Sequence, residues 1–441
     1  MPVNTSIPRT RGKGKVKVIE KRKMTQALIG KLETDDLDVT VSLIQALIPY
    51  GLKAVEEKLL AEVESLAGKR YRHGKENVRW GKQSGSVYLR DQKIPIMVPR
   101  VRDKNLKEEM PLKTYQKLQE PYLSDKQTML KLLNGISTRR YRRCAEFVPE
   151  VFGISPSNLS KRFKKTTGAM IRRLRTRSLS HYDFVCVFID GKRYANDGLL
   201  IALGVTIEGE KVILGVEQTH SENEKVTTEF IEGLIKRGLK FEHGLLFIVD
   251  GSKGLIKAIE SRFQEYAFIQ RCQQHKLKNV TSYLNDGQKE LCKTRLREAY
   301  GKTSYKEAKA ALENLNRELM NVNMSAAGSL LEGMEETLTL YTLGLAPELR
   351  KSLNSTNCIE SVMSQLGQYT DKVDRWRNSY QLLRWTSAAL LEIEPRLNPI
   401  EGSRYLNLLR LRMKKEIKKR REKKYESTDK RHELLETTVE V

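Results

Sequence analysis

Two aspartates follow two strongly apolar stretches of the chain. Residues 184–191 read FVCVFIDG, and residues 245–251 read LLFIVDG. Such apolar runs predict fully buried strands, which would end at Asp190 and Asp250. Either aspartate alone would be read as the cap of a turn. The repeated ending favours two carboxylates that meet at one edge of a sheet, where they could bind a metal ion or a ligand.

The segments around these two strands predict an α/β unit. The predicted elements are strands at 184–190, 199–207 and 210–218, a helix at 221–237, a strand at 245–250, a helix from 252 and a strand at 267–272. A tight turn at Glu208–Gly209 joins the second and third strands. Three strands in a meander, followed by helix, strand, helix and strand, is the order of a ribonuclease-H-like domain. In that topology the first and fourth strands are neighbours, so Asp190 and Asp250 would meet.

The composition limits the possible functions. The chain has 441 residues, which predicts two or three domains, and its net charge is +25. A pI near 9.7 favours an anionic partner, most often nucleic acid. No signal peptide is expected, and no apolar run approaches the roughly 18 residues of a membrane span. No basic amphipathic helix with aromatic anchors is found either, so no membrane partner is expected. The 5 scattered cysteines favour a reduced compartment, which we expect to be the cytoplasm.

The first part of the chain predicts a DNA-binding region. Residues 1–23 form a basic arm that either contacts phosphate or is merely solvated. Helical periodicity follows over residues 24–67, interrupted at Pro49 and Gly51. The stretch SVYLRDQKIPIMVPRV at residues 86–101 predicts a β-hairpin with its turn near residues 90–93.

A helix-turn-helix is predicted within the basic segment 135–180, which has 12 Lys or Arg and 2 acids. Its first helix would span residues 137–151 and its second residues 155–165, with Leu159 and Phe163 packed inward. The predicted DNA contacts are four exposed, groove-facing residues, Ser157, Asn158, Lys161 and Arg162, and two phosphate-binding lysines, Lys164 and Lys165. An ordinary helical hairpin with a solvated basic face remains the alternative.

Five sequence blocks identify a wider resemblance. In order they are FIDGKR, VDGSKGL, RCQQHKLKNV, NCIES and VDRWRNSYQLLRWTSAALLEIE. Together with the predicted hairpin they resemble the Mutator-type transposases of bacterial insertion sequences, over most of residues 40–410. The resemblance implies a DDE transposase, which uses two aspartates and one glutamate on a ribonuclease-H-like core. Carried over by position, these are Asp190, Asp250 and Glu360.

The resemblance also sets the expected organisation. The fold class is a multidomain α+β protein, with a mostly helical DNA-binding region and a ribonuclease-H-like catalytic core interrupted by an all-helical insertion. The predicted parts are a basic arm at 1–23, the DNA-binding region at 24–180, the core at 181–280 and 353–412, the insertion at 281–352 and a charged tail at 413–441. From the residues alone, Glu360 lies in the first turn of a helix and could merely satisfy the helix dipole.

The implied chemistry explains these residue types. Two Mg²⁺ ions, about 4 Å apart, activate the nucleophile and stabilise the leaving oxygen in such sites. Mg²⁺ prefers carboxylate oxygens, so Asp190, Asp250 and Glu360 are the expected ligands, and Mn²⁺ is expected to substitute. The expected partner is double-stranded DNA, both the terminal inverted repeats and the target. Pairing two element ends implies a homodimer or a larger assembly on the bacterial nucleoid.

Cys272 and His275 form a C-x-x-H pair within the third block. A structural zinc site needs four ligands, and no second Cys/His pair is close in the sequence, which argues against zinc. The family shares this pair beside its active centre, so His275 is expected to contact DNA or orient the catalytic site. A buried structural pair remains an open alternative.

Two other functions fit parts of the sequence. A ribonuclease-H-like nuclease or resolvase would cut DNA without joining strands. A DNA-binding regulator would use the same basic region, with carboxylates that are only structural. The complete set of two aspartates and one glutamate argues against a regulator, because binding alone needs no metal site. Only a joining assay separates a transposase from a nuclease.

Overall fold

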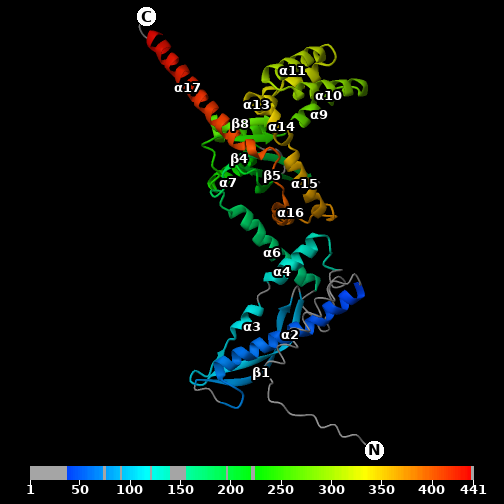
Figure 1. Cartoon of the computed structure of the whole chain (residues 1–441), viewed down its shortest axis with the longest axis vertical. Helices are drawn as coiled ribbons and strands as arrows, with labels where there is room; N and C mark the ends of the chain where they lie inside the picture. Colours follow the sequence, from blue (N-terminus) through cyan, green and yellow to red (C-terminus); the bar gives the residue numbers. More distant parts are fainter. Residues whose placement is uncertain are drawn as a thin grey trace, which may run out of the picture. The chain divides into compact units, whose positions relative to one another are not determined.

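The structure is a computed structural model that describes residues 37–72, 76–89, 92–119, 122–139, 155–194, 197–219 and 224–438. Figure 1 shows these elements in sequence colours. The chain divides into two compact units, Met1–Leu132 with Ile136–Phe163, and Leu133–Gly135 with Lys164–Val441. Some predictions fall wholly or partly outside the described residues: the basic arm at 1–23, the start of the first helix, the hairpin turn at 90–91, residues 140–154 of the helix-turn-helix and the helix start at 221.

The first unit is built around a three-stranded antiparallel sheet. It comprises α2 (Leu37–Ala67), β1 (Asn77–Leu89), β2 (Gln92–Asp103), β3 (Glu109–Met110), α3 (Lys113–Leu118), α4 (Tyr122–Leu133) and the start of α6 (Pro156–Thr176). The predicted hairpin is present as β1 and β2, with Val87 opposite Ile94. Apolar side chains of α2 pack on this sheet and form the core of the unit.

The prediction of a helix break at Pro49 and Gly51 is wrong, because α2 runs without interruption through both residues. A proline removes one helical hydrogen bond and a glycine costs about 1 kcal/mol. Beyond this point, Val55, Leu59 and Val63 are buried against the hairpin. Burial of each such side chain is worth roughly 1.5–3 kcal/mol, which offsets the local cost.

The second unit contains a five-stranded mixed sheet in the order β6-β5-β4-β7-β8. The strands are β4 (Phe184–Tyr194), β5 (Asp197–Thr206), β6 (Lys211–Thr219), β7 (Leu245–Val249) and β8 (Ala267–Arg271). Strands β4, β5 and β6 are antiparallel, whereas β4, β7 and β8 are parallel. Helices α7 (Glu224–Lys236) and α8 (Lys253–Phe263) provide the apolar side chains that pack on one face.

Only helices connect β8 to α15 (Asn357–Thr370). They are α9 (Gln273–Thr281), α10 (Asp286–Gly301), α11 (Tyr305–Met320), α12 (Met324–Leu331), α13 (Thr339–Thr342) and α14 (Ala346–Leu353), with a short 3-10 helix η2 (Glu335–Leu338) before α13. Helices α16 (Ser379–Ile393) and α17 (Leu406–Thr438) follow. The larger hydrophobic core joins these helices to the sheet.

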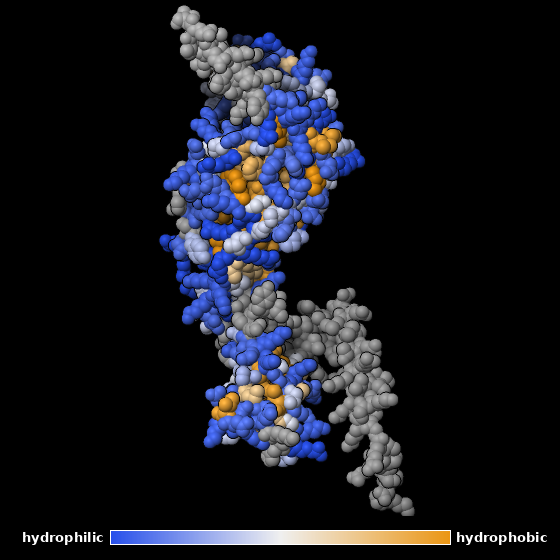
Figure 2. Space-filling model, turned by 90° about the vertical axis from the view of Figure 1, so that its left-hand side faces the viewer, coloured by the Kyte–Doolittle hydropathy of each residue, from blue (hydrophilic) through white to orange (hydrophobic). Residues whose placement is uncertain are grey.

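Polar and charged residues predominate on the described part of the surface that Figure 2 shows. Among the coloured residues of Figure 2, hydrophilic ones cover most of the face shown. In the described part of the chain, no helix combines the length and the apolar composition needed to cross a membrane. The sheet of the second unit, in contrast, is apolar throughout its strands β4 and β7 up to the two aspartates.

Candidate active site

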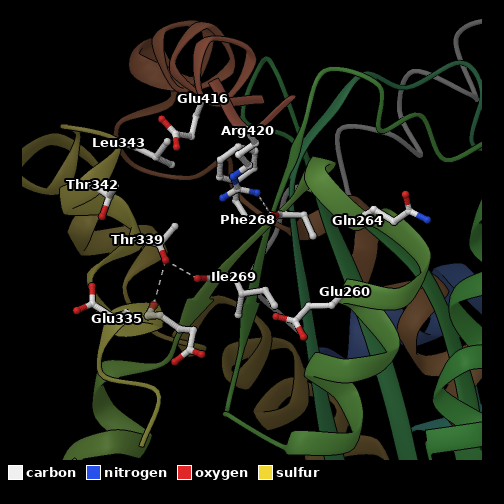
Figure 3. A pocket seen from close by; sticks show the side chains of 12 residues that line it. Glu260, Gln264, Phe268, Ile269, Glu335, Thr339, Thr342, Leu343, Glu416 and Arg420 are labelled. Atoms are coloured by element: carbon white, nitrogen blue, oxygen red, sulfur yellow. Dashed lines mark hydrogen bonds between the residues drawn. The ribbon is translucent and has the colours of Figure 1, made fainter. Parts of the chain in front are cut away.

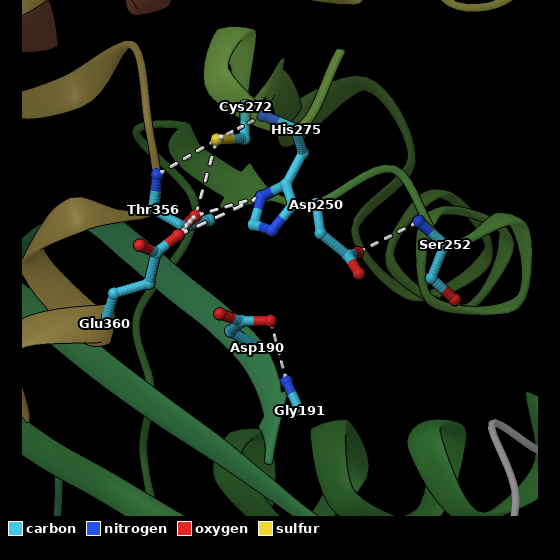
Figure 4. A network of polar contacts seen from close by, with 8 residues as sticks. All are labelled: Asp190, Gly191, Asp250, Ser252, Cys272, His275, Thr356 and Glu360. Carbon is cyan, nitrogen blue, oxygen red and sulfur yellow. Dashed lines mark hydrogen bonds and ion pairs between the residues drawn. The ribbon is translucent and has the colours of Figure 1, made fainter. Parts of the chain in front are cut away.

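The pairing of β4 with β7 brings Asp190 and Asp250 to the same edge of the sheet. The two strands are parallel neighbours, and the pairing ends with Phe188 beside Ile248. Because each aspartate lies two residues further along the chain, both carboxylates follow the end of this pairing. The Gly191 N–H donates to Oδ1 of Asp190 at 2.8 Å, and the Ser252 N–H donates to Oδ1 of Asp250 at 3.0 Å (Figure 4).

One detail of the prediction for the first strand is wrong. Strand β4 does not end at Asp190 but continues to Tyr194. The reason is that β5 pairs with β4 along this whole stretch, with Asp190 opposite Ile201. At Asp190, strand β4 is therefore hydrogen-bonded to β5 on one side and no longer to β7 on the other. Asp190 is 8% exposed.

Glu360 reaches this edge from the first turn of α15. The helix has a buried apolar face that includes Ile359, Val362, Met363 and Leu366. The Thr356 side chain does not cap the helix; its hydroxyl donates to Oε1 of Glu360 at 2.6 Å. This contact fixes the direction of the carboxylate, and the sequence analysis did not predict it.

The Cys272–His275 pair contacts the same threonine. Cys272 is fully buried, and its Sγ accepts from the backbone N–H of Thr356 at 3.4 Å and from that of His275 at 3.5 Å. Nδ1 of His275 lies 3.3 Å from the Thr356 hydroxyl and 4.0 Å from Oε1 of Glu360. A hydroxyl has one proton, which the shorter contact to Glu360 uses, so the Thr356 oxygen can accept a hydrogen bond from His275 when the imidazole carries a proton on Nδ1.

The pKa values of Asp190 and His275 are shifted by the charged groups around them. Burial, together with the charges of Asp250 and Glu360, raises the pKa of Asp190 to about 6, although the Gly191 N–H and His275 oppose the shift. Interaction with Cys272 raises the pKa of His275 against the effect of burial, and the charges of Asp190 and Glu360 add to this rise. Figure 4 shows the imidazole ring among the three carboxylates.

The three carboxylates fit a divalent cation by their chemistry. Hard oxygen ligands suit Mg²⁺, and a cation would relieve the repulsion that raises the pKa of Asp190. Within the described ranges, however, no three His, Cys, Asp or Glu side chains lie close enough together to hold a metal ion. The set therefore matches Mg²⁺ in ligand type, and its side chains would have to draw together to bind it.

Helix α6 carries the predicted DNA contacts. Leu159 and Phe163 are buried, as predicted. The side chains of Ser157, Lys161, Lys164 and Lys165 are exposed, and Asn158 is half-buried. The prediction that Arg162 is exposed is wrong: it is 8% exposed and its guanidinium lies 5.8 Å from the centre of the Tyr88 ring. Arg162 is three residues after Leu159, so it shares the inward face of the helix.

A separate cavity of about 320 Å³ lies beside β8 (Figure 3). It is lined partly by four glutamates, Glu260, Glu335, Glu336 and Glu416. Arg420 crosses it, donates to the carbonyl of Ala267 at 2.9 Å and covers the Phe268 ring. None of the three carboxylates of the candidate active site lines this cavity.

Comparison with known proteins identifies the family. The profile of the family described as "Transposase, Mutator family" matches residues 19–396. The transposase for insertion sequence element ISRM5 of Rhizobium meliloti is 27% identical over 84% of this chain and 94% of its own length. The transposase for IS256 in transposon Tn4001 of Staphylococcus aureus is 24% identical over 79% and 93%. The transposase for IS905 of Lactococcus lactis is 25% identical over 75% and 85%. This chain therefore belongs to the Mutator family of transposases.

Proposed function

We propose that this protein is a DDE transposase that binds the terminal inverted repeats of an insertion sequence and catalyses metal-dependent DNA cleavage and strand transfer. The observation that carries the proposal is the convergence of Asp190, Asp250 and Glu360 from two strands and a distant helix. Their mutual influence on the pKa of Asp190 supports a shared site. Acids that served only the fold would not need to approach one another, since their repulsion is destabilising.

The strand order supports a ribonuclease-H-like core. Three antiparallel strands, β6, β5 and β4, continue into the parallel strands β7 and β8. This is the arrangement expected from the order of elements in the sequence. The helices between β8 and α15 would then be an insertion that interrupts the core before its glutamate.

The proposed reaction has two steps. In the first, water attacks a phosphodiester at the element end; a bond forms from the water oxygen to phosphorus, and the bond from phosphorus to the 3′ oxygen breaks. The products are a 5′-phosphate and a free 3′-hydroxyl, whose oxygen takes up a proton. In the second, this hydroxyl attacks a phosphodiester of the target or opposite strand; a bond forms from its oxygen to phosphorus, the bond from that phosphorus to the 3′ oxygen of the attacked strand breaks, and the leaving oxygen takes up a proton.

Each residue at the site has a proposed task. Asp190, Asp250 and Glu360 would hold Mg²⁺, with Mn²⁺ as a substitute, and the cation would stabilise charge on the attacking and leaving oxygens. Thr356 would hold Glu360 in place through its 2.6 Å hydrogen bond. His275 would act as a positioning residue, because its Nδ1 faces Thr356 and Glu360. Its part-exposed ring also leaves room for contact with DNA.

DNA binding is proposed for two surfaces of the basic part of the chain. One is the exposed side of α6, with Ser157, Asn158 and Lys161, followed by Lys164 and Lys165. The other is the hairpin: Trp80 is 49% exposed, and the guanidinium of Arg102 lies 4.5 Å from its ring centre. An exposed aromatic ring beside a cation can contact both bases and phosphates. Activity on two element ends would require a dimer or larger assembly on the bacterial nucleoid.

A single experiment tests the proposal. The full chain is incubated with its own element ends, Mg²⁺ and a target plasmid, and cleaved and joined products are separated on one gel. Cleavage with joining supports the transposase. Cleavage without joining would identify a nuclease or resolvase, and specific binding without cleavage would identify a regulator. Scrambled ends of the same length are the control for sequence dependence.

A further inference from the structure

We propose that Arg271 and Glu332 form a positioning network that couples the helical segment after β8 to the Asp250 turn. The inference rests on the proposed function, since it assigns a role to residues that support one of its carboxylates. Among the described residues, neither forms a hydrogen bond or an ion pair with any of the three carboxylates. Their effect would pass through the backbone on which Asp250 is carried.

Arg271 provides the direct link. It is the last residue of β8 and is 6% exposed. Its Nη2 donates to the carbonyl of Gly251 at 3.1 Å, and its Nη1 donates to the carbonyl of Glu332 at 3.1 Å. Gly251 directly follows Asp250, so one guanidinium joins the catalytic turn to the end of α12. The planar fork of arginine can make both contacts at once, which the single ammonium of lysine cannot do in the same geometry.

Two glycines make room for this side chain. Gly251 has a φ of +105° and Gly333 a φ of +64°, both in the left-handed region. A Cβ added to Gly251 would collide with Nε of Arg271, and one added to Gly333 would collide with Nη1. The guanidinium therefore fills a space that both backbone turns leave open. Such a close approach of two glycine turns to one cation is unnecessary for a solvated surface arginine.

Glu332 connects further parts of the site. Its carboxylate lies 3.1 Å from Nζ of Lys253 at the start of α8, and 3.6 Å from Nη2 of Arg271. Its carbonyl also accepts from Lys276, which is 1% exposed and donates at 2.7 Å to the carbonyl of Ser329. Lys276 follows His275 on α9, so the end of α12 anchors the Asp250 turn and the His275 helix together.

This arrangement has a physical consequence. Buried cations are stable only while their partners remain in place, and removing one partner is costly. The carboxylate of Glu332 is the anionic member of the network and its side chain is 43% exposed, so it can be removed without creating a cavity. Its loss should release Arg271 from Gly251 and loosen the turn that carries Asp250.

The variant Glu332→Ala tests the coupling, with Glu318→Ala as a matched control. Glu318 lies in α11 and forms an exposed pair with Arg295 at 3.7 Å, with both side chains 51% exposed. Amide hydrogen exchange is measured on the full chain without DNA or metal. In Glu332→Ala the backbone amides of residues 250–252 should exchange about tenfold faster than in the wild type, as expected for weaker local protection. Glu318→Ala should leave them unchanged.

A second measurement addresses function. The Mg²⁺ concentration for half-maximal cleavage should rise about tenfold in Glu332→Ala, because a mobile Asp250 binds the cation less well. Binding of element ends should change by less than about twofold, since the network shares no residue with the proposed DNA contacts. Arg271→Lys keeps the charge but not the fork, and should show the same two effects.

The outcomes separate this inference from the proposed function. Exchange at residues 250–252 that is equal in Glu332→Ala and Glu318→Ala would overturn the coupling, whatever the activity. Wild-type protein that cuts no DNA would overturn the proposed function, while the exchange measurement would still decide whether the network holds the turn. Faster exchange in both Glu332→Ala and Arg271→Lys, but not in the control, supports the coupling.

Discussion

Asp190 is a buried carboxyl whose charge the fold disfavours. Burial and the neighbouring acids raise its pKa to about 6. The same buried position, beside Asp250 and Glu360, is what would make it an effective cation ligand in the proposed mechanism. Stability and function therefore make opposite demands on this residue, which is common at sites that hold charge.

Replacing Asp190 with Asn should stabilise the metal-free protein at neutral pH. The pKa is raised from 3.8, so the folded state binds the proton more tightly than the unfolded state does. The stability that this group contributes is then present below pH 3.8 and is lost as the pH rises through about 6. Asn removes this loss, and the free energy of unfolding at pH 7 should increase by roughly 2–3 kcal/mol.

The measurement is denaturant unfolding of wild type and Asp190→Asn in chelator at pH 4 and pH 7. The gain should be large at pH 7 and nearly absent at pH 4, where wild-type Asp190 is mostly protonated. Equal gains at both values would show that the effect is steric and that the pKa of Asp190 is not raised.

Removal of any one of the three carboxylates should abolish strand cleavage. Asp190→Ala, Asp250→Ala and Glu360→Ala are each expected to lower the cleavage rate by at least about a thousandfold, because each removes a proposed cation ligand. Binding of element ends should remain within about twofold of wild type. Asp286→Ala is the control, since that side chain is 99% exposed on α10. Near-normal cleavage by Glu360→Ala would show that another residue is the third ligand.

At the level of elements, α6 carries two sets of polar residues that are at least partly exposed. Asn158 lies near the start of the helix, where a side chain can reach base edges, and Lys164 and Lys165 follow one to two turns later. Arg162, which the sequence predicted as a DNA contact, belongs to neither set because it packs beside Tyr88. The hairpin offers an additional surface at Trp80 and Arg102.

The two sets on α6 should respond differently to mutation. Lys164→Ala and Lys165→Ala should weaken binding to all DNA alike and flatten the salt dependence by about one unit each, as lost phosphate contacts do. Asn158→Ala should reduce discrimination between the true end and random DNA by roughly 1–3 kcal/mol. Titrations of the full-length variants at several salt concentrations measure both effects. If Trp80→Ala loses discrimination while Asn158→Ala keeps it, recognition belongs to the hairpin.

For the whole molecule, the net charge and the connectivity of the chain agree with the proposed binding and cleavage of DNA. The net charge of +25 requires an anionic partner or a large counterion atmosphere. The proposed active site takes its acids from positions 60 and 110 residues apart in the chain. Between the second and third of these lie the helices that the Arg271–Glu332 network ties to the Asp250 turn.

Metal replacement should affect cleavage and binding separately. Mn²⁺ should support cleavage in place of Mg²⁺, whereas Ca²⁺ should support end binding with little cleavage, because its longer bonds and looser geometry misplace the reacting groups. Cleavage rates and binding affinities are compared at equal concentrations of the three ions. Full cleavage in excess chelator would contradict a metal-dependent mechanism.

Local sequence patterns were sufficient for much of the fold. The apolar runs before Asp190 and Asp250 predicted the buried strands, since residues covered on both faces leave no polar alternation. The order of strands and helices predicted that these strands are neighbours, which the parallel pairing of β4 and β7 confirms. Glu360 was identified by the resemblance of the block NCIES to the transposase family, and not by helical periodicity. A lone acid in a first helical turn has an ordinary explanation in the helix dipole.

Only the tertiary structure decided how distant side chains meet. The contact of Thr356 with His275 joins residues that are 81 positions apart in the chain, and no local pattern encodes that meeting. Tertiary packing also buries Arg162 beside Tyr88. It likewise keeps α2 helical across Pro49, because contacts with the neighbouring sheet outweigh local preferences. The sequence by itself determined which residues could do chemistry. Burial and pairing between distant segments determined which of them share a site, since those energies exist only once the chain has folded.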